Sequence, residues 1–279
     1  MFDFVELVVL LPSWYIWLIA FGFGVVIGSF LNVFIYRLHT GKSLGGSSHC
    51  LSCATPLKWF ELLPLLSYLA LRGRCRTCGC HIPVRYFIVE LVTGLLFVVG
   101  VGAAHSFFSL FTIWFVMAVL VVITVYDINH FIIPDGLTVA VLGGASLLLA
   151  ERVLHGYPLE ALWVDIAAAV AGAAFLFFLW FISKGQWLGF GDVKLAFPLG
   201  LLVGSSFVFS FIVLSFWVGA LLSLLIMGWQ LLPKRGQPRL STSRQQLTMK
   251  SAVPFAPFLV AGCLLVYFTH FNVLSLFSF

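Results

Sequence analysis

The sequence predicts an all-α, polytopic membrane protein with about eight transmembrane helices. Of its 279 residues, 62% are hydrophobic and only 9% are charged, and the mean hydropathy is +1.11. No single soluble core buries so large an apolar share. The apolar residues form continuous runs of the length that crosses a bilayer as a helix, whereas the strands of a membrane barrel would alternate apolar and polar residues.

The individual spans follow from the apolar runs and from the polar segments that end them. The first run extends from Trp14 to Tyr36, and a glycine- and cysteine-rich segment follows it. The run from Val193 to Trp229 exceeds one span of ~20 residues, so we divide it near Gly204. The predicted spans cover approximately residues 14–36, 84–102, 107–126, 135–150, 161–182, 193–204, 206–229 and 254–271. This order predicts a first transmembrane helix (1–36), a cytoplasmic loop (37–83) and a seven-helix membrane domain (84–279).

The basic residues predict how these helices are oriented. With the N-terminus outside, fourteen of the fifteen lysines and arginines fall in cytoplasmic segments, and only Arg152 falls outside. Such an excess of positive charge is typical of cytoplasmic loops. Both termini are therefore expected on the periplasmic side, and the basic loop from Leu231 to Lys250 is expected near anionic membrane lipid. The composition gives no support for nucleic-acid binding.

Four cysteines in the first cytoplasmic loop form two pairs of identical spacing. The pairs are Cys50-Leu-Ser-Cys53 and Cys75-Arg-Thr-Cys78. Two such pairs can supply four thiolates in a tetrahedron around Zn²⁺, and Gly73 and Gly79 would help the tight turns. Stable disulfides are disfavoured in the cytoplasm. We therefore predict a structural zinc site. Redox chemistry and unliganded thiols are the alternatives, and Cys80 and His81, beside the second pair, could compete as ligands.

Two aspartates lie where a carboxylate is costly unless it has a role. Asp127 ends the third run, where the helix dipole disfavours an anion. Asp192 opens the sixth run, where it could cap the helix and pair with Lys194, but capping does not explain the flanking Gly189 and Gly191. Glycines permit close backbone approach or positive φ, as a site for an extended peptide requires. We predict that Asp127 and Asp192 meet in an aspartyl protease site at the cytoplasmic boundary.

The remaining carboxylates have structural explanations. Asp135 precedes the fourth run and suits an N-cap, or a supporting role at the site. Glu90, inside the second run, is either a buried partner of Arg85 or Lys194 or part of a site. Four carboxylates are expected on the outer face as solvated charges: Glu6, Glu151, Glu160 and Asp165.

Five segments, taken in order, carry a resemblance to one family. They are Gly28 to Arg37, the two CxxC pairs, Arg85 to Gly94, Asp127 with Ile133-Pro134-Asp135, and Gly189 to Lys194. The combination resembles the type IV prepilin peptidases, which are GxGD-type membrane aspartyl proteases. The resemblance implies that Asp127 and Asp192 are catalytic, that Gly189, Gly191, Lys194, Asp135 and Glu90 support the site, and that Cys50, Cys53, Cys75 and Cys78 hold zinc.

The same resemblance implies an activity and a location. The expected substrates are prepilin and pseudopilin precursors of type IV pilus and type II secretion systems, whose short basic leader would be removed at the cytoplasmic face of the bacterial inner membrane. Members with the zinc loop commonly also methylate the new N-terminus with S-adenosylmethionine. That second activity rests on the resemblance alone.

Three other functions are alternatives to prepilin processing. A presenilin-like GxGD protease would lack the cysteine loop and would hold its aspartates deeper in the bilayer. A transporter could use Asp127 and Asp192 as ion or proton ligands, but would need carboxylates near the midplane. A membrane redox protein would need the CxxC pairs near an oxidising face.

Overall fold

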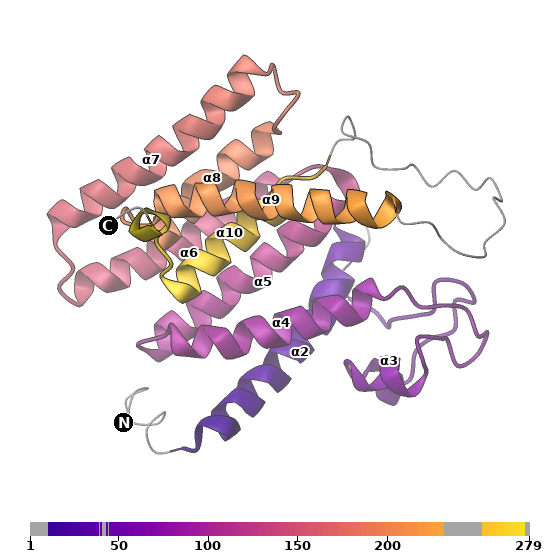
Figure 1. Cartoon of the computed structure of the whole chain (residues 1–279). Helices are drawn as coiled ribbons and strands as arrows, with labels where there is room; N and C mark the ends of the chain where they lie inside the picture. Colours follow the sequence, from indigo (N-terminus) through magenta and orange to yellow (C-terminus); the bar gives the residue numbers. More distant parts are fainter. Residues whose placement is uncertain (1–10, 39, 41–42, 44, 232–252, 277–279) are drawn as a thin grey trace. The chain divides into compact units, whose positions relative to one another are not determined.

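The computed structural model describes residues 11–38, 40, 43, 45–231 and 253–276, and within these residues it contains helices and no strand (Figure 1). The α-helices are α2 (Ser13–Arg37), α3 (Leu66–Ala70), α4 (Arg85–Gly102), α5 (Phe107–His130), α6 (Asp135–Leu154), α7 (Leu159–Ile182), α8 (Phe190–Val203), α9 (Val208–Leu231) and α10 (Ala256–Thr269). Two short 3-10 turns are η1 (Trp59–Leu62) and η2 (Val273–Leu276). Most of the predicted basic loop, residues 232–250, lies outside the described residues.

All eight predicted spans are helical, and the chain is a multi-pass membrane protein. Six helices are long and apolar enough to cross a membrane, namely α2, α4, α5, α6, α7 and α9. Helices α8 and α10 have 14 residues each, or about 21 Å at the usual rise, against a hydrocarbon core of ~30 Å. The predicted division near Gly204 is confirmed, because α8 ends at Val203 and Gly204 has a φ of +79°.

The third predicted span ends later than the sequence indicated. Helix α5 continues past Tyr126 to His130, so Asp127 lies in its last turn rather than in a polar break. Phe131 ends the helix with a φ of +56° while its N–H donates to the Asp127 carbonyl at 2.8 Å. The polarity of residues 127–130 suggested a loop, but polar residues in a final turn still make helical backbone hydrogen bonds.

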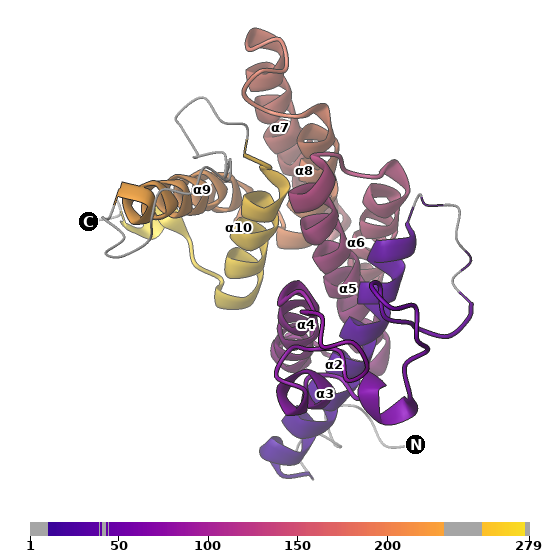
Figure 2. The same ribbon diagram turned by 90° about the vertical axis from the view of Figure 1, so that its right-hand side faces the viewer.

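The chain forms two compact units, which are described separately. The first comprises residues 1–126 and 139–152, and the second comprises residues 127–138 and 153–279. In the first unit, α2 and α4 lie side by side (Figures 1 and 2). A Cβ on Gly28 would lie 2.8 Å from the Cα of Glu90, and one on Gly24 would lie 2.8 Å from Phe97. Small residues thus let the two backbones approach, as is common between membrane helices.

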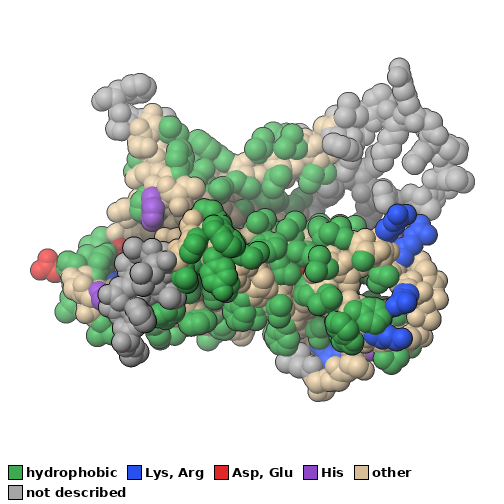
Figure 3. All heavy atoms as spheres, turned by 90° about the horizontal axis from the view of Figure 1, so that it is seen from below, with side chains coloured by type: hydrophobic (Ala, Val, Ile, Leu, Met, Phe, Trp, Pro, Cys, Tyr) green, Lys and Arg blue, Asp and Glu red, His purple; other side chains and the backbone are tan. Residues whose placement is uncertain are grey.

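In the second unit, α8 packs against α7, and α10 packs against α9 (Figure 2). A Cβ on Gly200 of α8 would lie 3.0 Å from the Cα of Ala169 in α7. A Cβ on Gly262 of α10 would lie 2.8 Å from the backbone nitrogen of Ser215 in α9. Hydrophobic side chains cover much of the described surface seen in Figure 3, as expected where lipid is the solvent.

The expectation that Asp165 is a solvated charge is wrong. Its side chain is 2% exposed. One carboxylate oxygen accepts a hydrogen bond from the Ser205 N–H at 2.7 Å, and the other accepts one from the Tyr157 hydroxyl at 2.8 Å. Asp165 therefore fastens α7 to the turn between α8 and α9, with both oxygens satisfied. The position of Asp165 near a predicted loop suggested that its side chain is exposed. The sequence could not show that the turn between α8 and α9 contacts it.

Candidate functional site

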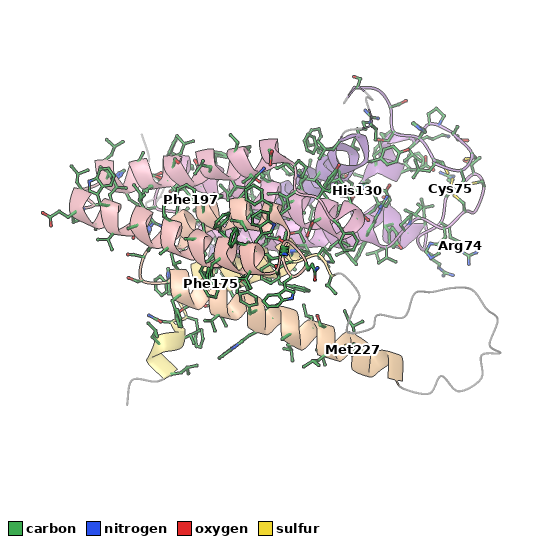
Figure 4. The ribbon with its side chains drawn as sticks, turned by 90° about the horizontal axis from the view of Figure 1, so that it is seen from above. Arg74, Cys75, His130, Phe175, Phe197 and Met227 are labelled. Carbon is green, nitrogen blue, oxygen red and sulfur yellow. The ribbon has the colours of Figure 1, made fainter. Side chains whose placement is uncertain are left out.

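The two cysteine pairs form a pair of turns with the same backbone pattern. Cys50 N–H donates to Thr55 O at 3.0 Å and Ala54 N–H donates to Cys50 O at 2.9 Å. In the second turn, Cys75 N–H donates to Cys80 O at 2.8 Å and Gly79 N–H donates to Cys75 O at 2.9 Å. Ala54 and Gly79 occupy equivalent positions and have φ values of +56° and +69°. Figure 4 shows Arg74 and Cys75 on this loop.

The four CxxC sulfur atoms fit a tetrahedral metal site. All four Sγ atoms lie within 4.8 Å of one another, and those of Cys50 and Cys78 are 3.8 Å apart. A tetrahedral Zn²⁺ with Zn–S bonds of 2.3 Å requires sulfur atoms about 3.8 Å apart. The Sγ of Cys80 also lies 3.4 Å from that of Cys50. This fifth thiol is therefore next to the predicted ligand set, as the sequence suggested.

Asp192 belongs to the second unit and uses its two oxygens differently. It is the third residue of α8, and its Oδ2 accepts a hydrogen bond from the Gly189 N–H at 3.1 Å. This is the helix-capping role that the sequence offered as an alternative. Its Oδ1 is buried and has no hydrogen-bond partner among the described residues. A buried polar atom without a partner is costly, so the position of Oδ1 calls for an explanation.

Asp127 lies beside Asp192 in the same unit. Asp127 is 5% exposed and Asp192 is 6% exposed, and the two carboxyl groups lie near enough for their charges to interact. The Oδ2 of Asp127 accepts a hydrogen bond from the Ala256 N–H, at the start of α10, at 3.3 Å. The structure thus brings the two predicted aspartates together, and the start of α10 contacts one of them. Nothing in the sequence around Ala256 signals this contact, because it is made by a backbone N–H.

The two glycines flanking Phe190 permit close approach. A Cβ on Gly191 would lie 3.2 Å from the Cβ of Ile133, and one on Gly189 would lie 3.2 Å from the Asp192 carboxylate. Gly189 has a φ of −73°, and Gly191 lies inside α8 with no positive φ. The sequence left two explanations for these glycines open. Close approach of neighbouring groups therefore explains them, and a positive φ does not.

Lys194 and Asp135 pair with each other, which corrects two predictions. The Lys194 ammonium donates to Asp135 Oδ1 at 2.8 Å and lies 5.2 Å from the centre of the Phe190 ring. Lys194 therefore does not pair with Asp192 as anticipated. Asp135 was also expected at the N-cap, but the carbonyl of Pro134 accepts from Leu137 N–H and Thr138 N–H, so Pro134 holds the N-cap position and Asp135 is the first residue of α6. The Asp135 carboxylate instead pairs with Lys194, which lies 59 positions away in sequence.

Glu90 lies in the first unit and does not pair with Arg85 as one interpretation proposed. Its carboxylate accepts from the Leu65 N–H at 2.8 Å. The Arg85 guanidinium instead lies over the Tyr86 ring, 5.2 Å from its centre. Glu90 belongs to the first unit, where the backbone of Leu65 donates to its carboxylate.

Comparison with known proteins gives two family matches, one after the other along the chain. The family described as "Bacterial Peptidase A24 N-terminal domain" matches residues 23–103, and the "Type IV leader peptidase family" matches residues 114–224. The "Prepilin leader peptidase/N-methyltransferase" of Bacillus subtilis (strain 168) is 30% identical over 258 residues, which cover 92% of this chain and 96% of the relative.

Two further relatives carry the same name. That of Aeromonas salmonicida (strain A449) is 31% identical over 280 residues, covering 89% of each chain. That of Myxococcus xanthus (strain DK1622) is 37% identical over 188 residues, which are 64% of this chain and 54% of the relative, so this match spans about half of the relative's length. No solved structure matches the chain.

Proposed function

The chain belongs to the prepilin leader peptidase/N-methyltransferase family, and on that premise we propose that it cleaves pilin-like precursors with Asp127 and Asp192. The observation that carries the proposal is the pairing of two buried carboxylates, one of which keeps an unpartnered oxygen. Two adjacent carboxylates cannot both ionise easily, so they share one proton. Such a pair can serve as general base and general acid together.

The surroundings of the two aspartates support a different role for each of them. Asp127 accepts a hydrogen bond from Ala256 at the N-terminus of α10, where the helix dipole favours negative charge. We assign Asp127 as the ionised base. Asp192 is buried beside that charge and its Oδ1 has no donor among the described residues. We assign Asp192 as the protonated acid.

These roles give a complete reaction. Asp127 takes a proton from a water molecule, and the resulting hydroxide adds to the scissile carbonyl while Asp192 donates a hydrogen bond to the carbonyl oxygen. When the C–N bond breaks, the proton held by Asp127 passes to the leaving amine. The products are a carboxylic acid on the leader and a free N-terminal amine on the mature protein. No covalent intermediate with the enzyme is required.

The proposed substrate is a precursor with a short basic leader and a hydrophobic helix in the bilayer. In the orientation that the basic residues predict, the site faces the cytoplasm, where such a leader would meet its membrane helix. We further propose that the chain methylates the new amine with S-adenosylmethionine. The zinc-binding loop folds the cytoplasmic segment, since a four-thiolate site leaves no open position for catalysis.

The test is incubation of the purified protein with a pilin-like precursor, followed by measurement of both size and N-terminal mass. A shorter product with one added methyl group supports both activities, and a shorter unmethylated product, with methyl donor present, removes the methyltransferase. No cleavage overturns the peptidase proposal. Asp127→Asn, given a synthetic peptide that begins at the mature N-terminus, should still incorporate methyl label, because methyl transfer does not need an activated water.

A further inference from the structure

The link between α5 and α6 has no role in the reaction described above. Residues 131–134 lie outside both helices and directly follow His130, the last residue of α5, which Figure 4 labels. The link leaves the helix that carries Asp127 and leads into α6 at Asp135. All of its residues belong to the second unit, as do both aspartates. The link and the catalytic pair can therefore be described together.

The link connects the surroundings of the two aspartates. The Phe131 N–H donates to the Asp127 carbonyl at 2.8 Å, which holds the start of the link on the last turn of α5. Ile133 is 8% exposed, and a Cβ on Gly191 would lie 3.2 Å from the Cβ of Ile133. Gly191 directly precedes Asp192 in the chain. The link therefore runs from the backbone of one aspartate to the residue beside the other.

The backbone of the link is largely unpaired. Ile132 and Ile133 have no hydrogen-bond partner for their N–H and C=O groups among the described residues, and the Phe131 carbonyl has none either. Pro134 ends this run, because proline has no N–H and its carbonyl accepts from the first turn of α6. A row of exposed, unpaired backbone groups is a template for pairing with another chain.

The side chains of the link agree with an extended edge that is open to a partner. Phe131 and Ile132 are 56% and 63% exposed, whereas Ile133 is buried. The residue before a proline favours extended backbone, and successive side chains of extended backbone point to opposite faces. One buried and one exposed isoleucine fit this pattern. Ile133 thus anchors the link against α8 while the link keeps its backbone groups available.

The segment that leads into α8 offers no such edge. The Gly189 N–H donates to Asp192 Oδ2 at 3.1 Å, and the Gly189 carbonyl accepts from the Asp192 N–H at 3.2 Å. The Trp187 N–H donates to Ser183 Oγ at 3.4 Å. These backbone groups already have partners inside the protein. Of the two irregular segments beside the aspartates, the link at residues 131–133 is therefore the better template for a peptide.

We propose that residues 131–133 bind the cleavage-site region of the precursor as an added β-strand. The inference rests on the peptidase part of the proposed function and deepens it, because it names how the substrate of Asp127 and Asp192 is held. A peptide paired with a free edge gains main-chain hydrogen bonds whatever its side chains are. In an antiparallel pair, one residue can exchange two hydrogen bonds with the residue opposite, so Ile132 alone can fix the register.

Strand pairing also prepares the substrate for cleavage. In a helix each carbonyl accepts a hydrogen bond from an N–H four residues later, so a scissile carbonyl inside the precursor's membrane helix would be occupied. In an extended peptide, the carbonyls that point away from the partner strand are free. A strand held at the link would therefore present an unpaired carbonyl near the two carboxylates.

The first test locates the peptide by disulfide exchange. Ile132→Cys is combined with Asp127→Asn, which should leave the precursor uncut, and the full chain is placed in nanodiscs. Pilin-like precursors are added that each carry one cysteine, activated as a mixed disulfide, at successive positions around the cleavage site. Side chains opposite each other in a strand pair have Cβ atoms about 4.5–5.5 Å apart. The yield of cross-linked product should therefore alternate with a period of two residues.

Two controls define the background of this exchange. Protein with the natural Ile132 reports exchange with the native cysteines. Val164→Cys places a thiol on an exposed position of α7 and should give no alternation. A period of three to four residues at Cys-substituted position 132 would show that the peptide binds as a helix, and a yield no higher than in the controls would show that it does not lie along the link. Either result overturns the inference.

The second test uses wild-type protein and changes only the substrate. Peptide bonds around the cleavage site, except the scissile bond, are N-methylated one at a time, so that each precursor lacks one N–H donor. Methylation at alternate positions should lower kcat/KM about threefold to tenfold, the usual effect of losing one hydrogen bond. Methylation at the positions between them should lower it less than about twofold. Equal effects at neighbouring positions would overturn strand pairing.

The two proposals fail in different ways. If wild-type protein cleaves the unmodified precursor but either test lacks the alternation, the strand inference fails and the proposed function stands. If wild-type protein cleaves no precursor, the peptidase proposal fails and the strand inference fails with it.

Discussion

The Lys194 ammonium of α8 donates to Asp135 Oδ1 at the start of α6 over 2.8 Å. This pair joins the N-terminal part of α8, the helix that carries Asp192, to the segment that follows Asp127. The two side chains are 40% and 72% exposed, so solvent screens their attraction, and an exposed pair contributes about 0–1 kcal/mol. Its main effect is to position the segments rather than to stabilise the fold.

Asp135→Asn should therefore be a mild variant. Asparagine keeps an oxygen that can accept from Lys194 and loses only the charge. We expect precursor cleavage to fall by less than about fivefold, corresponding to the ~1 kcal/mol upper value for an exposed pair. The measurement is the initial cleavage rate beside Asp127→Asn at equal protein concentration. An inactive Asp135→Asn with an active Asp127→Asn would show that the catalytic pair has been wrongly assigned.

Asp127→Asn and Asp192→Asn should each lower cleavage by roughly a hundredfold or more, the usual loss when a general acid or base is removed. Both variants should insert into the membrane and bind zinc normally, since both residues belong to the second unit and the cysteine loop belongs to the first. Asparagine at 192 can still accept from Gly189 N–H, so α8 should keep its first turn. Cleavage rate and zinc content are measured on the same preparations. Near wild-type cleavage by either variant would rule out the two-carboxylate mechanism.

Purified protein should contain about one zinc ion per chain, because the four CxxC sulfurs fit one tetrahedral ion. Replacing Cys50, Cys53, Cys75 and Cys78 with serine should remove the metal and unfold the loop. Cys263→Ser is the control, since Cys263 is a buried thiol of α10, outside the loop. The measurement is elemental analysis. Wild-type protein without zinc, purified in the absence of chelator, would contradict the prediction.

The first cysteine turn should tolerate a glycine at position 54 better than its natural alanine. Ala54 has a φ of +56°, and glycine occupies the equivalent position in the second turn. Removing the Cβ from this conformation is worth roughly 1 kcal/mol. Ala54→Gly should therefore bind zinc more tightly, and Gly79→Ala should bind it less tightly, in competition with a chelator. The opposite order would mean that the two turns are not equivalent in solution.

Asp165→Ala should lower the thermal stability of the protein. The substitution leaves the Ser205 N–H and the Tyr157 hydroxyl without their carboxylate, at a cost of about 2 kcal/mol. Asp165→Asn, which keeps one acceptor oxygen, should be less destabilising. The midpoint of thermal unfolding in detergent reports both. Equal midpoints for wild-type and Asp165→Ala protein would show that the buried carboxylate has no structural role.

The helices and the cysteine site could be predicted because they depend on local pattern. Apolar runs determine where helices form in a bilayer, and the CxxC spacing brings each pair of thiols together within one turn. Three contacts could not be predicted, namely Asp165 with Ser205, Lys194 with Asp135 and Ala256 with Asp127, because each joins residues at least 40 positions apart. The Ala256 contact is the least visible of the three, since any residue except proline provides the same backbone N–H.

The divided use of the Asp192 carboxylate has a consequence for inhibitor design. The Gly189 N–H already binds Oδ2, so Oδ1 is the oxygen of Asp192 that has no hydrogen-bond partner among the described residues. A compound with one hydroxyl group in place of the scissile carbonyl can satisfy that oxygen. A second hydroxyl on the same carbon would have to compete with the backbone of α8 for Oδ2. Mono-hydroxyl isosteres should therefore be preferred over geminal diols as starting compounds.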